Sequence, residues 1–132
     1  MSTRVDLAGL AQALADYDYA YLLTVNDEGR AHAVAVTPTL TDGVLGIDEP
    51  GRRTAANLAG RRTVTLVFPP RQRDGYSLII DGDATAGDGP LRVTPTTAVL
   101  HRPAPPGSGD SATGCGSDCQ RIEAEVSTGV PG

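Results

Sequence analysis

Side chains that could carry out chemistry are few in this sequence. The two histidines, His32 and His101, lie far apart in the chain and each falls on or beside a predicted strand, which favours surface or packing roles over catalysis. No serine lies in a Gly-x-Ser-x-Gly context, the pattern of an activated nucleophile. The acidic run Asp81–Asp83 lacks the later Gly and Glu that a calcium-binding EF-hand loop requires. Any reactive group is therefore expected to be a bound cofactor.

The two cysteines, Cys115 and Cys119, lie close together in a glycine-rich part of the chain, so no disulfide framework is expected to cross the fold. A tetrahedral zinc site needs four ligands, and the sequence holds no second cysteine pair. Three interpretations stay open: a zinc ion shared between subunits, a reversible disulfide, and a tail with no role in the core, which is favoured. Both thiols could also shape a partner's pocket across a dimer interface.

The main binding signal is the stretch from Asp42 to Phe68, which predicts a short strand, a turn, a short helix and a second strand. Arg52, Arg53 and Thr54 stand where that helix begins. Unpaired N–H groups at a helix start, together with guanidinium groups, suit a phosphate or another small anion. Most stretches of this kind are solvated turns, so the surrounding fold has to show whether this one binds an anion.

The composition limits the classes of function. A chain of 132 residues is expected to form one domain with a modest core, and 39% hydrophobic residues with one Phe and no Trp suit closely packed strands. The net charge is −5, all eleven basic residues are Arg, and no basic stripe with paired aromatics is present, which argues against nucleic-acid binding. No run approaches the roughly 20 apolar residues of a membrane span and no signal-peptide core is present, so we expect a cytoplasmic protein with no membrane partner.

Regularly spaced short strands joined by Asp-Gly and similar turns predict a small antiparallel barrel. Pro38 indicates an edge position or a bulge near the end of its strand, Gly82 a bulge or close approach, and Pro95 an interruption. A helix is expected over residues 6–17, with Asp6 as its N-cap. Besides the strand that ends at Phe68, strands are expected over residues 20–25, 31–40, 44–47, 76–86 and 91–100.

The chain divides into an expected barrel domain over residues 1–103 and a Gly/Pro/Ser-rich tail over residues 104–132. The tail has the low-complexity composition of a flexible or ligand-ordered segment. Residues 121–126 could add a short edge strand.

The order of elements resembles the pyridoxamine 5′-phosphate oxidase-like, flavin-binding split-barrel proteins, particularly the short actinobacterial members. The resemblance covers about residues 6–103, and its pieces follow the opening helix: DYAYLLTVNDEGRAHAVAVTPTL, DGVLGIDEPGRRTAANLAGRRTVTLVF, SLIIDGDATAGDG and LRVTPTTAVLHRP. It implies a mainly β fold, a six-stranded antiparallel split β-barrel with two short helices. It also implies a homodimer with two equivalent cofactor sites at the interface.

The resemblance further implies a set of cofactor-binding positions and no catalytic or metal-binding residue. The strand ending in Val36, Thr37 and Pro38 is expected to lie along the isoalloxazine ring. The phosphate is expected near Ile47, Asp48, Arg52, Arg53, Thr54 and Asn57. Many members carry Lys where this chain has Thr54. Replacement of that Lys by Arg53, weaker binding and a different ligand all remain open.

The resemblance implies an FMN-binding oxidoreductase that acts on a small substrate. A deazaflavin coenzyme in the same cleft is the near alternative, and a non-catalytic protein that stores, carries or senses flavin or haem is the third. The tail does not match the longer C-terminal part of the pyridoxamine phosphate oxidase itself, so vitamin B6 synthesis is not expected. The substrate and the electron donor are not identified by the sequence.

Overall fold

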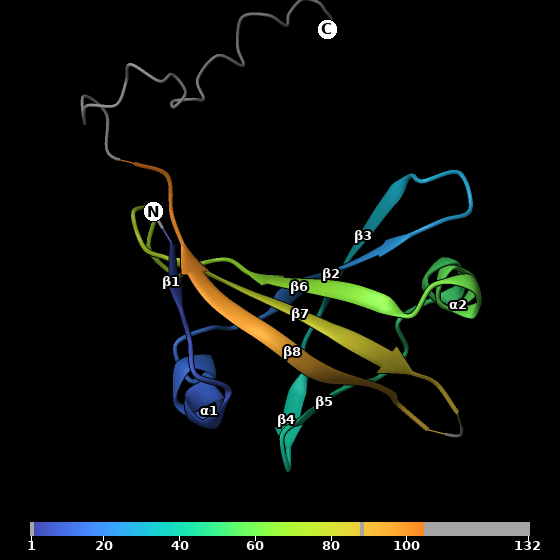
Figure 1. Ribbon diagram of the computed structural model, residues 1–132, viewed down its shortest axis with the longest axis horizontal. Coiled ribbons are helices and arrows are strands. Elements are labelled where there is room, and N and C mark those ends of the chain that lie inside the picture. Colours follow the sequence, from blue (N-terminus) through green and yellow to red (C-terminus); the bar gives the residue numbers. More distant parts are fainter. Residues whose placement is uncertain (1, 88, 105–132) are drawn as a thin grey trace, which may run out of the picture. The chain divides into compact units, whose positions relative to one another are not determined.

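The computed structural model describes residues 2–87 and 89–104, of which Ser2–His101 form one compact unit. Its strands make one antiparallel sheet, accompanied by two short helical segments (Figure 1). The strands are β1 (Ser2–Arg4), β2 (Ala20–Val25), β3 (Ala31–Val36), β4 (Thr39–Thr41), β5 (Val44–Ile47), β6 (Thr63–Phe68), β7 (Ser77–Thr85) and β8 (Leu91–His101). The helical segments are a 3-10 turn, η1 (Leu7–Gly9), which runs into α1 (Leu10–Leu14), and α2 (Arg52–Gly60).

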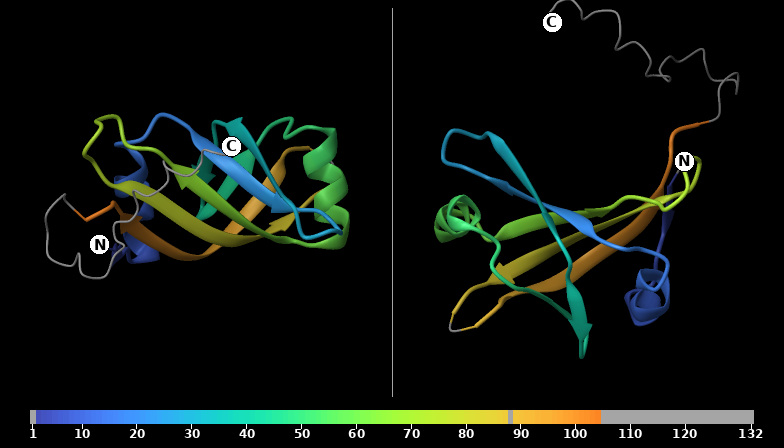
Figure 2. Two further views of the ribbon diagram at one scale, coloured as in Figure 1. Left: turned by 90° about the horizontal axis from the view of Figure 1, so that it is seen from above. Right: turned by 180° about the vertical axis from the view of Figure 1, so that it is seen from behind.

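The order of the strands explains how the sheet curls. It runs β3-β2-β6-β7-β8-β5-β4, with β1 paired to β8. The two strands at its ends, β3 and β4, are consecutive in the chain and are joined only by Thr37 and Pro38. The sheet therefore has to bend back on itself, and Figure 2 shows the resulting half-barrel. This architecture confirms the predicted class: a mainly β, antiparallel split barrel with two short helices.

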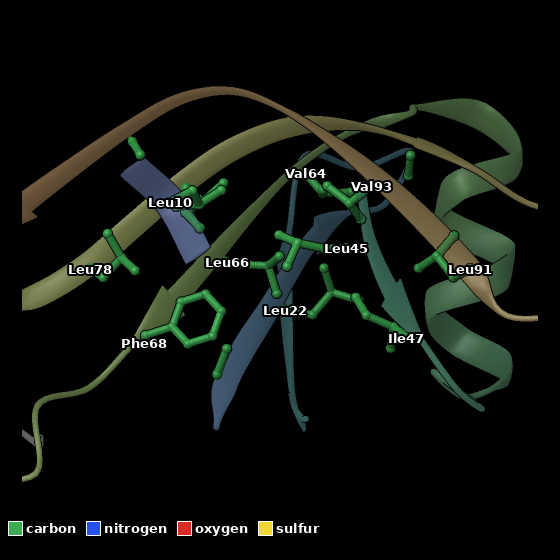
Figure 3. Close-up of a cluster of buried hydrophobic side chains, with 14 of the residues drawn as sticks. Leu10, Leu22, Leu45, Ile47, Val64, Leu66, Phe68, Leu78, Leu91 and Val93 are labelled. Carbon is green, nitrogen blue, oxygen red and sulfur yellow. The ribbon is translucent and has the colours of Figure 1, made fainter. Parts of the chain in front are cut away.

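The core lies inside the curve of the sheet. Alternate residues of each strand face inward, as in β2, where Leu22 is fully buried between two more exposed neighbours. The single phenylalanine, Phe68, is 3% exposed, and Figure 3 shows it among aliphatic side chains from several strands. The helices lie at opposite ends of the sheet (Figures 1 and 2) and contribute Leu10 from α1 and Leu58 from α2. Each fully buried aliphatic side chain contributes roughly 1.5–3 kcal/mol.

The described part of the chain has eight strands where six were expected. Residues Ser2–Arg4 were not recognised as a strand, yet they pair with the end of β8. The strand expected over residues 31–40 is broken at Thr37–Pro38, because β3 pairs with β2 whereas β4 pairs with β5. Proline has no N–H to donate, so it suits the break between these two edge strands.

The bulge expected at Gly82 is confirmed, because the register of β7 with β8 shifts between Asp81 and Gly82. A Cβ atom at Gly82 would lie 2.6 Å from the carbonyl oxygen of Thr94, so only glycine fits. The interruption expected at Pro95 is wrong, since β8 continues through it. Pro95 lies opposite Gly82 beside the bulge, where ladder hydrogen bonds are already disrupted and a missing N–H is tolerated.

The helix expected over residues 6–17 is shorter and has two parts. Asp6 is its N-cap as predicted, and its carboxylate accepts a hydrogen bond from the backbone N–H of Ala8 at 3.2 Å. Gly9 separates the 3-10 turn from α1, which agrees with the low helix propensity of glycine. The two cysteines and the strand considered over residues 121–126 lie outside the described residues. Within the described part, no helix is long and apolar enough to cross a membrane.

Candidate functional site

Helix α2 begins without a side-chain cap. Gly51 occupies the N-cap position with φ of 101°, a conformation open to glycine, and among the described residues there is no side-chain cap hydrogen bond. The first turn also contains no acidic residue. The N–H groups at a helix start carry a partial positive charge, and here no carboxylate of the first turn offsets it.

Two arginines extend this positive end. Arg52 and Arg53 are exposed, and neither makes an ion pair or side-chain hydrogen bond with another described residue. Arg61 differs, because it pairs with Asp27 at 2.9 Å. Unpaired guanidinium groups can grip an oxyanion through two parallel hydrogen bonds. The beginning of α2 therefore suits a phosphate or another small anion.

The opposite face of α2 packs on the sheet. The side-chain amide of Asn57 donates a hydrogen bond to the hydroxyl oxygen of Thr24 on β2 at 2.9 Å, and these residues are 8% and 1% exposed. Thr54 is fully buried, and its hydroxyl has no hydrogen-bond partner in the part of the chain that the structure describes. Of the four helix residues predicted at the phosphate, Arg52 and Arg53 face solvent, whereas Thr54 and Asn57 are buried. Asn57 joins the helix to the sheet.

The strand ends predicted to line the cofactor come close together. The register of β4 with β5, continued by two residues, sets Thr37 opposite Asp48. Both residues are exposed, whereas Val36 and Pro38 are half-buried. Ile47 is fully buried, so its side chain belongs to the core and only its backbone is available to a ligand. Three residues then lead from Asp48 to α2, so the predicted ring and phosphate positions follow each other closely along the chain.

An aromatic hollow of about 240 Å³ adjoins this region at Pro38 and includes Tyr17 and Phe68. The hydroxyl of Tyr17 donates a hydrogen bond to the backbone carbonyl of Tyr76 at 2.7 Å. Burial, and to a smaller degree the charge of Asp16, raise the pKa of Tyr17 above its usual value, so the hydroxyl keeps its proton at neutral pH. No local pattern in the sequence predicts this contact, because the two tyrosines are 59 residues apart.

The histidines do not form a catalytic group with each other. His32 is half-buried on β3, while Nδ1 of His101 lies 3.1 Å from the hydroxyl of Ser2 at the end of β8. Among the residues that the structure describes, no three His, Cys, Asp or Glu side chains lie close enough together to hold a metal ion.

No protein-family model matches the chain. Two mycobacterial proteins match most of its length: the uncharacterized proteins Mb0449c of Mycobacterium bovis and MT0457 of Mycobacterium tuberculosis. Each is 48% identical to this chain over an alignment that covers 88% of this chain and 93% of the relative.

Solved structures of similar fold include proteins that are named for different ligands. An FAD-binding protein from Mesorhizobium loti has a TM-score of 0.61 at 10% identity and covers 77% of this chain and 99% of its own. An F420 reductase has a TM-score of 0.55 at 17% identity, with 66% and 94% covered. The haem storage protein HutZ from Vibrio cholerae has a TM-score of 0.52 at 14% identity, with 70% and 91% covered. At these identities the likeness shows the fold alone. The chain thus has the split-barrel fold of these proteins, and it belongs to one family with Mb0449c and MT0457.

Proposed function

We propose that the protein binds a flavin-type cofactor, with FMN as the leading candidate, and acts as an oxidoreductase on a small molecule. The observation that carries this proposal is the uncapped start of α2 with its two unpaired arginines, set beside the strand ends of a split barrel. Arg52 and Arg53 would hold the phosphate, and the strand segment around Thr37 would support the ring. The cofactor, when bound, supplies hydride transfer.

A deazaflavin coenzyme is the second candidate for the same region. The F420 reductase shares the fold, and the two relatives of the family are mycobacterial proteins. A phosphate held by outward-facing arginines does not discriminate between flavin and deazaflavin, because both ligands carry a phosphate. A carrier of flavin or haem, without catalysis, is the third candidate, and the fold of HutZ supports it.

We further propose a homodimer with the cofactor at the interface. Tyr21 and Val25 on the outer face of β2 are 41% and 36% exposed, and they lie opposite Ala35 and Ala31 of β3. An apolar strip of this kind suits a contact between subunits. Sedimentation that gave only the 13.6 kDa monomer would contradict the dimer. A cytoplasmic location stays a prediction from the sequence.

The spectrum and mass of the ligand that co-purifies with the protein test the cofactor. We expect absorbance near roughly 450 nm for FMN, near roughly 420 nm for the deazaflavin, and a Soret band for haem. Protein that purifies free of ligand is titrated with FMN and with the deazaflavin coenzyme. Failure to bind either in the micromolar range would refute the proposal.

The double substitution Arg52→Gln with Arg53→Gln tests the phosphate position. We expect at least about tenfold weaker cofactor binding, since charge-assisted hydrogen bonds contribute about 1.5–3 kcal/mol each and tenfold corresponds to about 1.4 kcal/mol. The control is Arg30→Gln with Arg73→Gln, which removes the same charge from two exposed positions elsewhere. Equal affinities for the two double variants, with circular dichroism unchanged, would place the phosphate elsewhere.

A further inference from the structure

A second hollow, of about 470 Å³, lies over β4, β5 and the start of β8. Gly46 stands at its centre and faces outward, because its neighbours Leu45 and Ile47 are fully buried in the core. In the register of the sheet Gly46 lies opposite Thr39 on one side and Arg92 on the other. The backbone of β5 therefore forms the floor of the hollow.

Neither packing nor backbone conformation requires glycine at this position. A Cβ atom at Gly46 would meet only the carbonyl oxygen of Thr39, at 3.7 Å, which is an ordinary contact, and Gly46 is not among the residues with positive φ. This distinguishes it from Gly82, where an added Cβ would meet backbone at 2.6 Å. Glycine inside a strand is often found at a bulge, at a bend, or where a ligand or another backbone approaches closely, and the last of these needs no strain at Gly46 itself.

The polar side chains around this floor have no partners among the residues that the structure describes. Arg92 is exposed and makes no ion pair or side-chain hydrogen bond with any residue that the structure describes. The hydroxyls of Thr39 and Thr41 border the same hollow without side-chain hydrogen bonds to described residues. The guanidinium group of Arg92 and the hydroxyls of Thr39 and Thr41 are therefore hydrogen-bond donors that border the same hollow.

Two carboxylates lie at the ends of the floor. Asp48 lies two residues beyond Gly46, roughly 6.6 Å along the strand, and neighbouring strands are roughly 4.8 Å apart. The backbone positions of Arg92 and Asp48 are therefore separated diagonally by about 8 Å, and the two side chains form no ion pair. Asp42 stands at the opposite end, beside the β4–β5 turn.

These charges select the class of ligand. One guanidinium and two carboxylates line the hollow, and the whole chain carries a net charge of −5, so a dianion is repelled. A small molecule with a carboxylate at one end and an ammonium group at the other can pair with both the positive and the negative side chains of the hollow. The carboxylate of such a molecule accepts two parallel hydrogen bonds from the guanidinium group of Arg92, and its ammonium group lies toward Asp48. The hydroxyls of Thr39 and Thr41 supply further hydrogen bonds.

We propose that this hollow binds a small zwitterion of the amino-carboxylic acid class. The inference does not depend on the cofactor, although Asp48 borders both regions. If the cofactor proposal also holds, the zwitterion binds beside the cofactor, in the place of a substrate.

Titration of the cofactor-free protein with 4-aminobutyrate tests the binding, followed by ¹H–¹⁵N spectra of the backbone amides. We expect saturable shifts at Gly46 and its neighbours on β4, β5 and β8. Butyrate and butylamine, which each keep one end of the molecule, are expected to bind at least about tenfold more weakly, a difference of about 1.4 kcal/mol. Succinate serves as the dianion and is expected not to bind. The absence of saturable shifts with 4-aminobutyrate, or equal binding of butyrate, would overturn the proposal.

Two substitutions act on this hollow by different routes. Arg92→Gln removes the guanidinium, and Gly46→Val fills the floor at a position that accepts a β-branched residue in a strand. Each is expected to weaken 4-aminobutyrate binding at least about tenfold without lowering the melting temperature. Gly46→Ala is the smaller alternative if Gly46→Val proves unstable. Unchanged affinity in both the arginine and the glycine variant would overturn the proposal.

Two controls separate this site from the cofactor site. Arg30→Gln removes an exposed charge elsewhere and is expected to keep full affinity for 4-aminobutyrate. The double variant Arg52→Gln with Arg53→Gln is also expected to keep it, because these arginines belong to the proposed phosphate position. Loss of 4-aminobutyrate binding in that double variant would refute the independence of the two sites.

Discussion

The hydrogen bond between Asn57 and Thr24, which joins helix α2 to strand β2 at 2.9 Å, can be tested with two substitutions of similar shape. Asn57→Leu leaves the hydroxyl of Thr24 buried without its donor, and Thr24→Val leaves the amide of Asn57 without its acceptor. A buried polar group that loses its partner costs about 1–3 kcal/mol, so we expect each single variant to lose about 2 kcal/mol of unfolding free energy. The double variant places two apolar groups together, and we expect it to lose less than about 1 kcal/mol.

Urea unfolding followed by circular dichroism measures this cycle. The expected coupling is the loss of the double variant minus the two single losses, or about −3 kcal/mol. In a unit of about 100 residues, a loss of 2 kcal/mol lowers the melting temperature by roughly 8–16 °C. Simple addition of the two losses would refute the structural role. If Asn57→Leu kept full stability and lost cofactor affinity, Asn57 would instead belong to the phosphate site.

Two further substitutions test the packing of the sheet and of α1. Gly82→Ala is expected to lose about 1–3 kcal/mol of unfolding free energy, because its Cβ would lie 2.6 Å from the backbone of Thr94. Gly46→Ala, with its nearest atom at 3.7 Å, is the matched control and should change by less than about 0.5 kcal/mol. Tyr17→Phe is expected to lose about 0.5–1.5 kcal/mol, the contribution of its bond to Tyr76. The raised pKa of Tyr17 also makes the wild type lose stability as the pH rises above about 10, because the unfolded tyrosine ionises first. The pKa of Tyr19 is raised as well, so unfolding at pH 8 and pH 11 should show a smaller loss for Tyr17→Phe than for the wild type.

The parts of the fold that depend on local patterns were predictable from the sequence. Strands β2 and β5 have the predicted bounds, because alternation and the flanking turns define them within a few residues. Gly82 stands at the expected bulge, where the register of β7 with β8 shifts. In each case the signal and the structure involve the same short segment.

The parts that depend on distant pairing were not predictable in this way. Strand β1 has a short, exposed sequence whose reason for being extended is its pairing with β8, almost 100 residues later. The division at Thr37–Pro38 likewise follows from the different partners of β3 and β4. Proline alone indicated only an edge or a bulge.

The orientation of α2 was the main gap in the predicted site. An amphipathic helix is expected to bury its apolar side chains, yet α2 buries the polar residues Thr54 and Asn57 together with Leu58. Asn57 is accommodated because Thr24 accepts its hydrogen bond. A pattern of residue types could not supply this information, because the acceptor lies 33 residues earlier in the chain.

Many members of the split-barrel family that this chain resembles carry a lysine at the position of Thr54. The burial of Thr54 explains why a lysine would fit poorly here. Because Thr54 is 0% exposed, a lysine placed here would have to extend its ammonium group past the helix backbone or leave it buried, and an unpaired buried charge is costly. The positive charge that a phosphate needs is supplied more readily by exposed side chains one and two residues earlier. Arg52 and Arg53 are such side chains, and each offers a bidentate fork rather than a point charge. On this reasoning, threonine at position 54 does not argue against the proposed phosphate binding, since Arg52 and Arg53 offer their guanidinium groups on the outer side of the same helix turn.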